Sequence, residues 1–313
     1  MNYSPVVCFG FDRPMHLKRM LDSLEKNNES KDTIVYICVD GPTEHTDIDQ
    51  HKLTLDVAND KNWKFKQTIP ILRKDNYNCR TNIITTISEL FQKHDRLIIL
   101  EDDLIIGKYF LNYMNLALEK YKEEKNMWHI NGYSYQQINN SYGSSISTYV
   151  SPWGWGTWKD RWEIFINEDF DKKNFISQLE DEERLNFNLG NLYDWEDIII
   201  KNEAGKISAW DAYWYQAIFL NDGYSLFPNK SHTQNEGFDG TGMHCSEISD
   251  WNTSLNNKKT RRFPNQIKVN KFFNFNTILF YRIYNLRRYF RYHADKFSSF
   301  ENFFKFLRKK LKV

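Results

Sequence analysis

The chain of 313 residues is long enough for one large α/β domain or for two smaller ones. Hydrophobic residues make up 41% of it and charged residues 27%, which excludes a wholly disordered protein. The net charge of +1 is unevenly spread, because Arg282 to Val313 carry ten Lys/Arg against two Asp/Glu and the remainder carries 32 against 39. An acidic body with a basic tail argues against nucleic-acid binding, for which a basic surface on the folded body is expected.

The sequence contains no run of about 18 to 20 uninterrupted apolar residues, the length that a membrane-spanning helix needs. Its N-terminus lacks the charged and apolar regions of a secretion signal. The four cysteines, Cys8, Cys38, Cys79 and Cys245, show no CxxC spacing typical of a zinc site. We therefore expect reduced thiols in a cytoplasmic protein, and any membrane contact to be peripheral.

The first 133 residues alternate apolar runs with amphipathic segments, a pattern that predicts a mostly parallel sheet with helices on its faces. We expect Asp12 to cap the first helix, with Pro14 in its first turn. Ligands of such sheets bind beyond the carboxyl ends of the strands, where Asp40 and the run from Glu101 to Asp103 lie. The expected strands span residues 6–9, 34–39, 97–100 and 127–130, and the other helices lie around 83–91 and 110–121.

Three consecutive carboxylates, Glu101, Asp102 and Asp103, directly follow a buried apolar run. Because like charges repel, such a cluster is costly unless a cation neutralises it. Mg²⁺ or Mn²⁺, held by one or two carboxylates and by the oxygens of a diphosphate, fits this arrangement, with Asp103 as the main candidate ligand. The alternative is a solvated turn whose carboxylates are favoured by the dipole of the next helix.

Several segments between Val6 and about Cys245 together resemble the GT-A fold glycosyltransferases, and among them most the β-1,2-N-acetylglucosaminyltransferase I group and its bacterial relatives. The resemblance implies a Rossmann-like, mixed but mostly parallel sheet flanked by helices, and transfer of a sugar from a nucleotide diphosphate to an acceptor hydroxyl. The segments are Asp12-Arg13, Asp40-Gly41, Asn78 to Ile83, the LIILEDDL stretch from Leu97 to Leu104, the Trp-rich segment, Trp210 to Trp214 and Gly237 to Cys245.

On this resemblance, residues 1–133 form the nucleotide-sugar-binding half of one domain and 134–265 the acceptor-binding half. Near Ser134 the composition becomes rich in Ser, Asn, Gly and Trp, which is consistent with that division. Residues 266–313, a basic and aromatic helical tail, are not covered by the resemblance.

The resemblance implies that Arg13 and Asp40 contact the nucleotide, that Asp102 lies near the ribose beside Glu101, and that Asp103 coordinates the metal. Arg is a forked donor for phosphate oxygens and Asp accepts from a base or a sugar hydroxyl, so the residue types agree. For Arg13 the alternative is a surface salt bridge, and for Asp40 a plain turn.

Two further positions are weaker candidates for the same site. Arg80 has the chemistry to reach a phosphate, although an arginine at a helix start usually has no such duty. His244 is expected to reach back to the metal or diphosphate, because a late histidine does so across GT-A enzymes. The alternative is a structural histidine.

The segment SPWGWGTWKDRW, residues 151–162, contains four tryptophans among twelve residues. Indole faces stack on sugar rings, and Gly154 and Gly156 let the backbone come close, so we expect Trp155 and its neighbours to wall the donor-sugar or acceptor pocket. The alternative is a packing cluster that joins the two halves.

Transfer with inversion needs a base to take the proton from the attacking hydroxyl. Asp211 is the first candidate, because it matches the acidic position before a helix that the resembling inverting enzymes use. Glu196 and Asp197 are rivals, and Asp211 as a simple N-cap is the other interpretation.

The tail from Phe297 to Leu311 places Phe and Leu on one helical face with Lys and Arg around them. This composition is typical of an interfacial helix on an anionic membrane, and it predicts a peripheral protein on the inner face of the cell membrane. Docking of the same face on the body or on a partner is the alternative.

The predicted function is inverting transfer of N-acetylglucosamine or a related hexose from a UDP-sugar to a hydroxyl of a bacterial surface glycan or a lipid-linked acceptor. A metal-dependent nucleotidyltransferase is a second possibility, but the glycine-rich basic loop expected of it does not follow Phe9. A non-catalytic scaffold that binds nucleotide sugars is a third, against which the full set of acidic positions weighs.

Overall fold

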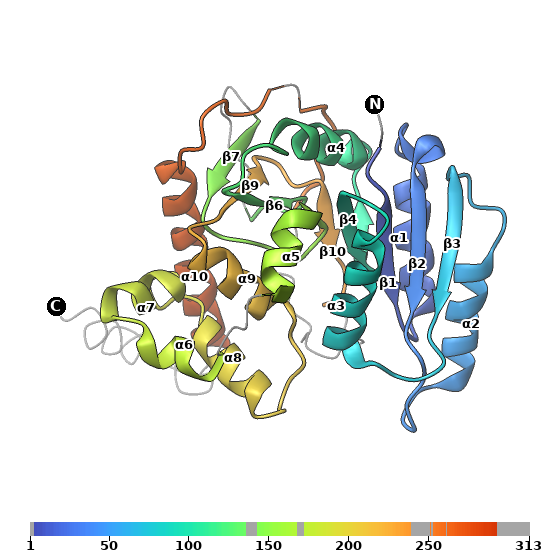
Figure 1. Ribbon diagram of the computed structural model, residues 1–313, viewed down its shortest axis with the longest axis horizontal. Helices are drawn as coiled ribbons and strands as arrows, with labels where there is room; N and C mark the ends of the chain where they lie inside the picture. Colours follow the sequence, from blue (N-terminus) through green and yellow to red (C-terminus); the bar gives the residue numbers. More distant parts are fainter. Residues whose placement is uncertain are drawn as a thin grey trace.

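The computed structural model describes residues 3–135, 143–167, 172–238, 251, 253–260 and 262–292. Its centre is an eight-stranded sheet in the order β3-β2-β1-β4-β8-β6-β9-β7 (Figure 1). Strands β3, β2, β1 and β4 run parallel, as do β6 and β9, whereas β8 and β7 are antiparallel to their neighbours. The strands are β1 Val6–Gly10, β2 Ile34–Val39, β3 Gln67–Leu72, β4 Arg96–Glu101, β6 Met127–Asn131, β7 Ser144–Ser147, β8 Trp155–Trp158 and β9 Tyr224–Pro228.

Helices cover both faces of this sheet, as the alternating side chains of β1 show. Val6 and Cys8 pack in one core with α1, α2 and α4, whereas Val7 and Phe9 pack in the other with α3, α5, α8, α9 and α10. Strands buried on both faces are continuous apolar runs. The helices are α1 Pro14–Glu25, α2 Ile48–Asn59, α3 Asn78–Phe91, α4 Phe110–Lys120, α5 Lys159–Asn167, α6 Lys172–Gln178, α7 Asp181–Phe187, α8 Trp195–Glu203, α9 Asp211–Leu220 and α10 Lys271–Tyr292, with a 3₁₀ turn at Ser30–Asp32.

A second, two-stranded sheet forms where β5, Leu104–Ile106, pairs antiparallel with β10, Thr233–Asn235. Its register sets Asn235 opposite Leu104. Because Leu104 directly follows the carboxylate run, this pairing brings the end of β10 next to those carboxylates.

The expected fold class is confirmed: a mixed, mostly parallel sheet with helices on both faces and a helical C-terminal segment. The four expected strands are also present, to within one residue at each end. The prediction that Asp12 caps the first helix was wrong, because Arg13 is the N-cap residue and Pro14 is the first helical residue. The Arg13 side chain makes no capping hydrogen bond.

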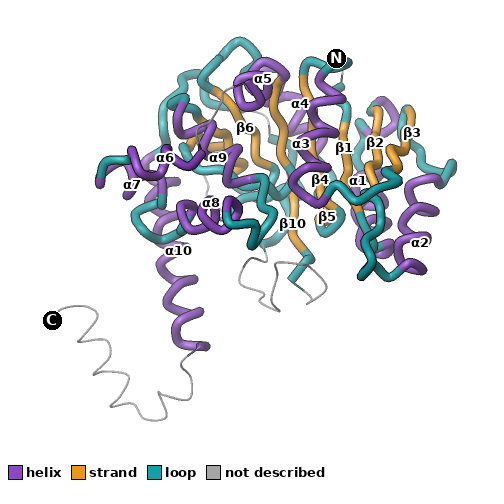
Figure 2. The backbone as a smooth tube through the Cα atoms, turned by 60° about the horizontal axis from the view of Figure 1, so that its bottom comes forward, coloured by secondary structure: helices purple, strands orange, loops and turns teal. Residues whose placement is uncertain are grey.

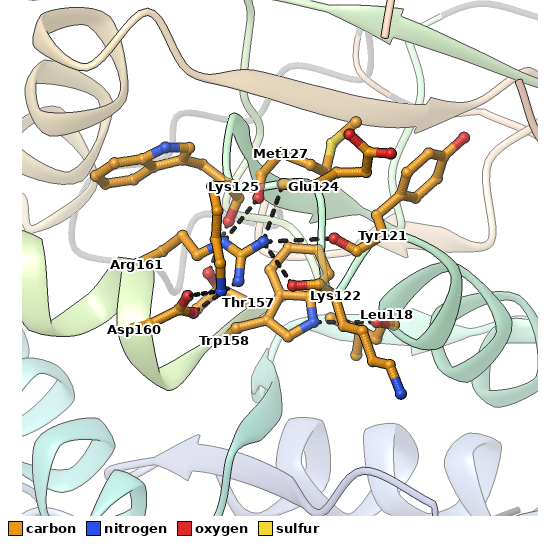
Figure 3. Close-up of polar contacts among 11 residues, drawn as sticks. Leu118, Tyr121, Lys122, Glu124, Lys125, Met127, Thr157, Trp158, Asp160 and Arg161 are labelled. Atoms are coloured by element: carbon orange, nitrogen blue, oxygen red, sulfur yellow. Dashed lines mark hydrogen bonds and ion pairs between the residues drawn. The ribbon is translucent and has the colours of Figure 1, made fainter. Parts of the chain in front are cut away.

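The Trp-rich segment forms β8 and the start of α5, and part of it packs against α4. Trp158 donates from Nε1 to the carbonyl of Leu118 at 3.0 Å. Arg161, only 2% exposed, lies over the Trp158 ring at 4.5 Å and pairs with Asp160. Its other partners are the carbonyls of Tyr121, Lys122, Glu124 and Met127 (Figure 3). These bonds satisfy carbonyls near the C-terminal end of α4 and fix the turn into β6.

The expected tail begins in the structure as α10, whose inner face packs on the body. Phe273 and Tyr281 are buried there, and Asn285 Nδ2 donates to the carbonyl of Leu192 at 2.8 Å. The aromatic face expected from Phe297 to Leu311 lies outside the described residues. Within the described ranges, no helix combines the length and the apolar character that crossing a membrane requires.

Candidate functional site

The carboxyl ends of three neighbouring parallel strands converge at one edge of the large sheet. Asp40 follows β2, Arg13 is the N-cap residue of α1 after β1, and Glu101 ends β4. The register of β1 sets Gly10 opposite Val39 and Phe9 opposite Glu101, so these side chains start from adjacent positions. The sheet therefore brings together Arg13, Asp40 and Glu101, which lie within 88 positions of one another in the chain. This agrees with the prediction that Asp40 and Glu101 lie at the carboxyl ends of neighbouring strands.

Arg13 forms an ion pair with Asp102 at this edge. Its Nε lies 3.3 Å from Oδ2 of Asp102, a second contact joins Nη2 to Oδ1, and Nη2 is 3.6 Å from Oδ2 of Asp103. The third nitrogen, Nη1, is buried without a hydrogen-bond partner in the described part of the chain. An unpaired buried donor is costly, so this nitrogen fits an anion such as a phosphate oxygen of a bound ligand.

The carboxylates of Glu101, Asp102 and Asp103 outnumber the cationic side chain beside them, Arg13. Burial, together with the charges of Asp103, Asp211 and Asp102, raises the pKa of Glu101 well above its usual value. Burial raises the pKa of Asp102 to about 7, although the charge of Arg13 opposes this. Burial also raises the pKa of Asp103. An excess of buried negative charge of this kind is stabilised by an additional cation.

The donor set fits a hard divalent cation held in part by its substrate, since Asp103 keeps 15% of its side chain exposed beside carboxylates of raised pKa. Among the described residues, no three His, Cys, Asp or Glu side chains are arranged as a complete metal site. The expected ligand His244 lies outside those residues. His232, by contrast, is buried against the Tyr113 ring at 4.8 Å, and burial lowers its pKa to about 3.

Asp211 is the first residue of α9 and faces the same carboxylate group. Its negative charge raises the pKa of Glu101 and that of Cys79, which places Asp211 near both. Burial raises the pKa of Asp211 itself to about 6, against the lowering effect of backbone N–H groups at the helix start. A carboxylate with a pKa near neutrality is suited to accept a proton at physiological pH.

Trp155 positions the start of α9. Its ring is 0% exposed and stacks on His129 at 5.0 Å and on Trp210, the residue before Asp211, at 5.1 Å. The expectation that Trp155 walls a pocket was therefore wrong, and the packing interpretation holds for this residue. Trp153 is only partly buried and contacts Phe238 at 5.8 Å, so the segment approaches the site through a different tryptophan.

Asp40 is tied into the loop that precedes α3. Its Oδ1 accepts from the backbone N–H of Gly41 and of Tyr77, each at 3.0 Å, while Oδ2 makes no hydrogen bond within the described chain. Gly41 is needed here, because a Cβ on it would lie 2.3 Å from the backbone of Asp75. One oxygen of Asp40 thus shapes the loop and the other remains for a ligand.

Arg80 points toward α9 and not toward Asp102. Its guanidinium lies 5.5 Å from the centre of the Tyr213 ring, and Nη1 is 3.5 Å from the Tyr213 hydroxyl. Arg80 is therefore packed on Tyr213 of α9, and any contact with a phosphate stays a prediction.

The rival bases Glu196 and Asp197 are occupied elsewhere. Glu196 pairs with Arg184 at 2.5 Å, and Asp197 pairs with Lys201. Both line a surface cavity of about 430 Å³ formed with α7 and the loop after it. The geometry favours Asp211 as the base.

Two residues of the site were given no role from the sequence, although both lie in segments that carry the resemblance. Cys79, at the start of α3, is a free thiol whose pKa is raised by burial and then by the charges of Glu101 and Asp211. Gly237 follows β10, and a Cβ on it would lie 2.5 Å from Oδ2 of Asp103. Neither position carries a local signal, because both depend on contacts between distant segments.

Gly237→Ala is expected to lower the activity of this site by a factor on the order of 10², since the new methyl group must displace the Asp103 carboxylate and displacement by about 1 Å commonly costs that much. Turnover and thermal unfolding of the purified variant would be measured. Gln234→Ala, in the preceding strand β10 and partly exposed, is the control. Unchanged turnover in Gly237→Ala would show that the position of Asp103 is not critical.

Comparison with known proteins gives remote structural similarity only. No protein-family model matches the chain, and no curated protein matches it. Among solved structures, S. aureus TarS matches with a TM-score of 0.36, 13% identity and coverage of 54% of this chain and 30% of its own. The mannosyltransferase PcManGT from Pyrobaculum calidifontis, in complex with GDP-Man and Mn²⁺, matches with a TM-score of 0.36 and 9% identity. The match covers 51% of this chain and 46% of PcManGT.

The galactosyltransferase LgtC, in complex with donor and acceptor sugar analogs, matches with a TM-score of 0.36, 12% identity and coverage of 69% of this chain and 70% of its own. The chain thus spans less than half the length of TarS and of PcManGT. At these TM-scores the likeness carries no information about activity, which has to be inferred from the residues of the site.

Proposed function

We propose that the chain is a metal-dependent, inverting glycosyltransferase that moves a sugar from a nucleotide diphosphate to an acceptor hydroxyl. The observation that carries the proposal is the convergence of Glu101, Asp102 and Asp103 around one arginine, Arg13, which retains an unpaired buried nitrogen. Asp211 lies near enough to Glu101 for its charge to add to the effect of burial on the pKa of Glu101. This arrangement combines a place for a cation, a donor for a phosphate and a carboxylate of raised pKa.

Each group has one part in a single displacement. Asp211 takes the proton from the acceptor hydroxyl as its oxygen bonds to the anomeric carbon, and the bond from that carbon to the diphosphate oxygen breaks. Arg13 donates to the diphosphate through Nη1, and Asp103 holds a divalent cation. A bound Mg²⁺ or Mn²⁺ supplies positive charge for the departing diphosphate.

The finer assignments follow from the resemblance to the β-1,2-N-acetylglucosaminyltransferase I group. We propose a UDP-sugar, N-acetylglucosamine or a related hexose, as donor, with Asp40 and Asp102 toward the nucleoside. The acceptor is a glycan or a lipid-linked saccharide of the bacterial surface, which fits a cytoplasmic protein at the inner face of the membrane.

Slow release of nucleoside diphosphate from a panel of nucleotide sugars, with Mn²⁺ and with a chelator, tests this function. We expect release from one or a few donors, at a rate that the chelator suppresses. Pyrophosphate formed from a nucleoside triphosphate and a sugar phosphate would show a nucleotidyltransferase instead. Donor binding without release, even with a range of saccharide acceptors, would identify a binding scaffold.

A further inference from the structure

An exposed apolar stripe runs along the outer face of α10. Five side chains at intervals of three and four residues form it, and this spacing places them on one side of a helix. They are Phe272, Phe275, Leu279, Ile283 and Leu286, with exposed fractions of 63%, 60%, 42%, 41% and 49%. Single exposed apolar residues are ordinary, but a continuous row of five indicates a binding surface.

The inner face of the same helix is already used, so the stripe cannot turn inward. Phe273 and Tyr281 are buried in the core, and Asn274 accepts from the Ser147 hydroxyl at 2.8 Å. These contacts hold α10 in one rotation about its axis. The stripe therefore faces away from the body as a fixed feature of the fold.

The charged side chains of α10 are all basic. Residues 271–292 contain five basic residues, Lys271, Arg282, Arg287, Arg288 and Arg291, and no acidic residue. At about 100° per residue, Lys271 and Arg282 fall along one edge of the stripe and Arg287 along the other. An apolar face bordered by cations matches a surface that is apolar inside and anionic outside.

Two other occupants are disfavoured by the same charges. A second copy of the chain would bring another helix of five positive charges against this one, which costs free energy at close range. Residues 293–313 of the chain itself carry six Lys/Arg against two Asp/Glu, so they too would be repelled by α10.

We propose that the outer face of α10 docks on an anionic lipid bilayer, with the stripe in the boundary between headgroups and acyl chains and the basic residues against lipid phosphates. Figure 2 shows the C-terminal half of α10 extending beyond the rest of the described chain, and Figure 1 places the helix on the side of the molecule opposite α2. The exposed fractions of the five stripe residues show that the body leaves them accessible.

Docking in this orientation would bring the acceptor side of the candidate site toward the lipid. Tyr281 on the inner face of α10 donates to the hydroxyl of Tyr135 at 3.2 Å and packs on Tyr193 at 5.6 Å. Burial raises the pKa of both Tyr135 and Tyr193, and the charge of Asp211 adds to this effect, so these rings lie near the candidate base. The surface that meets the bilayer is thus separated from the site by α10 and by the aromatic side chains on its inner face.

Sedimentation of the full chain with vesicles tests the docking. One set of vesicles contains phosphatidylcholine alone, and the other contains about 30% phosphatidylglycerol as well, which makes its surface anionic. We expect binding to the anionic vesicles only, weakening as salt rises. The triple variant Phe272→Ser, Phe275→Ser, Leu279→Ser should bind on the order of 10² more weakly. Each of these side chains is about half exposed, and burying that exposed part in the bilayer should raise the membrane affinity about fivefold. Lys271→Gln with Arg282→Gln should weaken binding about 25-fold, from roughly fivefold for each charge.

The control replaces Ile48 and Leu53, exposed apolar residues of α2 on the opposite side of the molecule, with serine. This control variant should bind as the parent does. Thermal unfolding of every variant shows that the fold persists.

Three results would overturn the proposal. Full-length protein that stays in the supernatant with anionic vesicles at low salt excludes docking on such membranes. Equal binding by the stripe variant would assign the membrane contact to residues outside α10. A dimer in sedimentation velocity that the stripe substitutions dissociate would show that a second copy covers this face. None of these readings depends on catalysis, so a failure of the proposed function would not resemble a failure of the docking.

Discussion

Asp103→Asn is expected to abolish metal-dependent turnover, with a loss on the order of 10² to 10³ or more, while the protein remains folded and gains stability without metal. The catalytic loss follows because stabilisation of developing charge by a single preorganised group is commonly worth that factor. The gain in stability follows because burial raises the pKa of Asp103, so its ionised form at neutral pH is disfavoured in the folded state. Nucleotide release and the unfolding temperature would be measured together.

The unfolding temperature also reports on binding directly. Mn²⁺ with a nucleoside diphosphate should raise it for the parent and much less for Asp103→Asn, because a ligand that binds only the native state stabilises it. Asp22→Asn, a carboxylate on α1 that pairs with Lys18 at 2.7 Å and lies apart from the cluster, is the matched control. A variant at Asp103 that transfers sugar at the parental rate with Mn²⁺ would disprove the assignment.

Asp211→Asn is expected to preserve donor binding and to lower the transfer rate by a factor of about 10² to 10⁴, the usual effect of losing a general base. The parent rate should rise with pH through about 6, because burial raises the pKa of Asp211 to that value and only the ionised carboxylate accepts a proton. The variant should lose this dependence on pH. The rate at saturating donor, measured from about pH 4 to about pH 8, a range of about two units on either side of the pKa, checks both expectations.

Asp197→Asn is the matched control, because Asp197 is also a carboxylate in the first turn of a helix but pairs with Lys201. It should transfer at the parental rate. A loss of donor affinity in Asp211→Asn as large as its loss of rate would make Asp211 a binding residue. A product that keeps the anomeric configuration of the donor would exclude the base role.

The part of the site that sequence predicted is the part encoded in contiguous residues. An apolar run buried on both faces followed at once by Glu101, Asp102 and Asp103 marks both a strand and its carboxyl end. The edge strand β3 had no such signal, because Gln67 to Leu72 is half exposed and contains Pro70. Local pattern therefore identified the centre of the sheet and missed its border.

Burial and long-range pairing account for the rest. Trp155 has the side chain of a sugar-stacking residue, and only the placement of β8 between β4 and β6 decides that its ring is enclosed. The approach of Gly237 to Asp103 depends on β10 pairing with β5 across more than 120 residues of sequence. Such contacts arise from the whole topology, and no short window of sequence contains them.

The antiparallel strand β8 lies between the two parallel blocks of the sheet and hydrogen-bonds to both β4 and β6. Strands β1 to β4 come from the first 101 residues, so this block can pair while the ribosome is still making the remainder. Until Trp155 to Trp158 emerge, β4 is an open sheet edge able to recruit a strand from another nascent chain. Synthesis that stalls before this segment would therefore leave an aggregation-prone intermediate, and a chaperone that shields β4 would act in that interval.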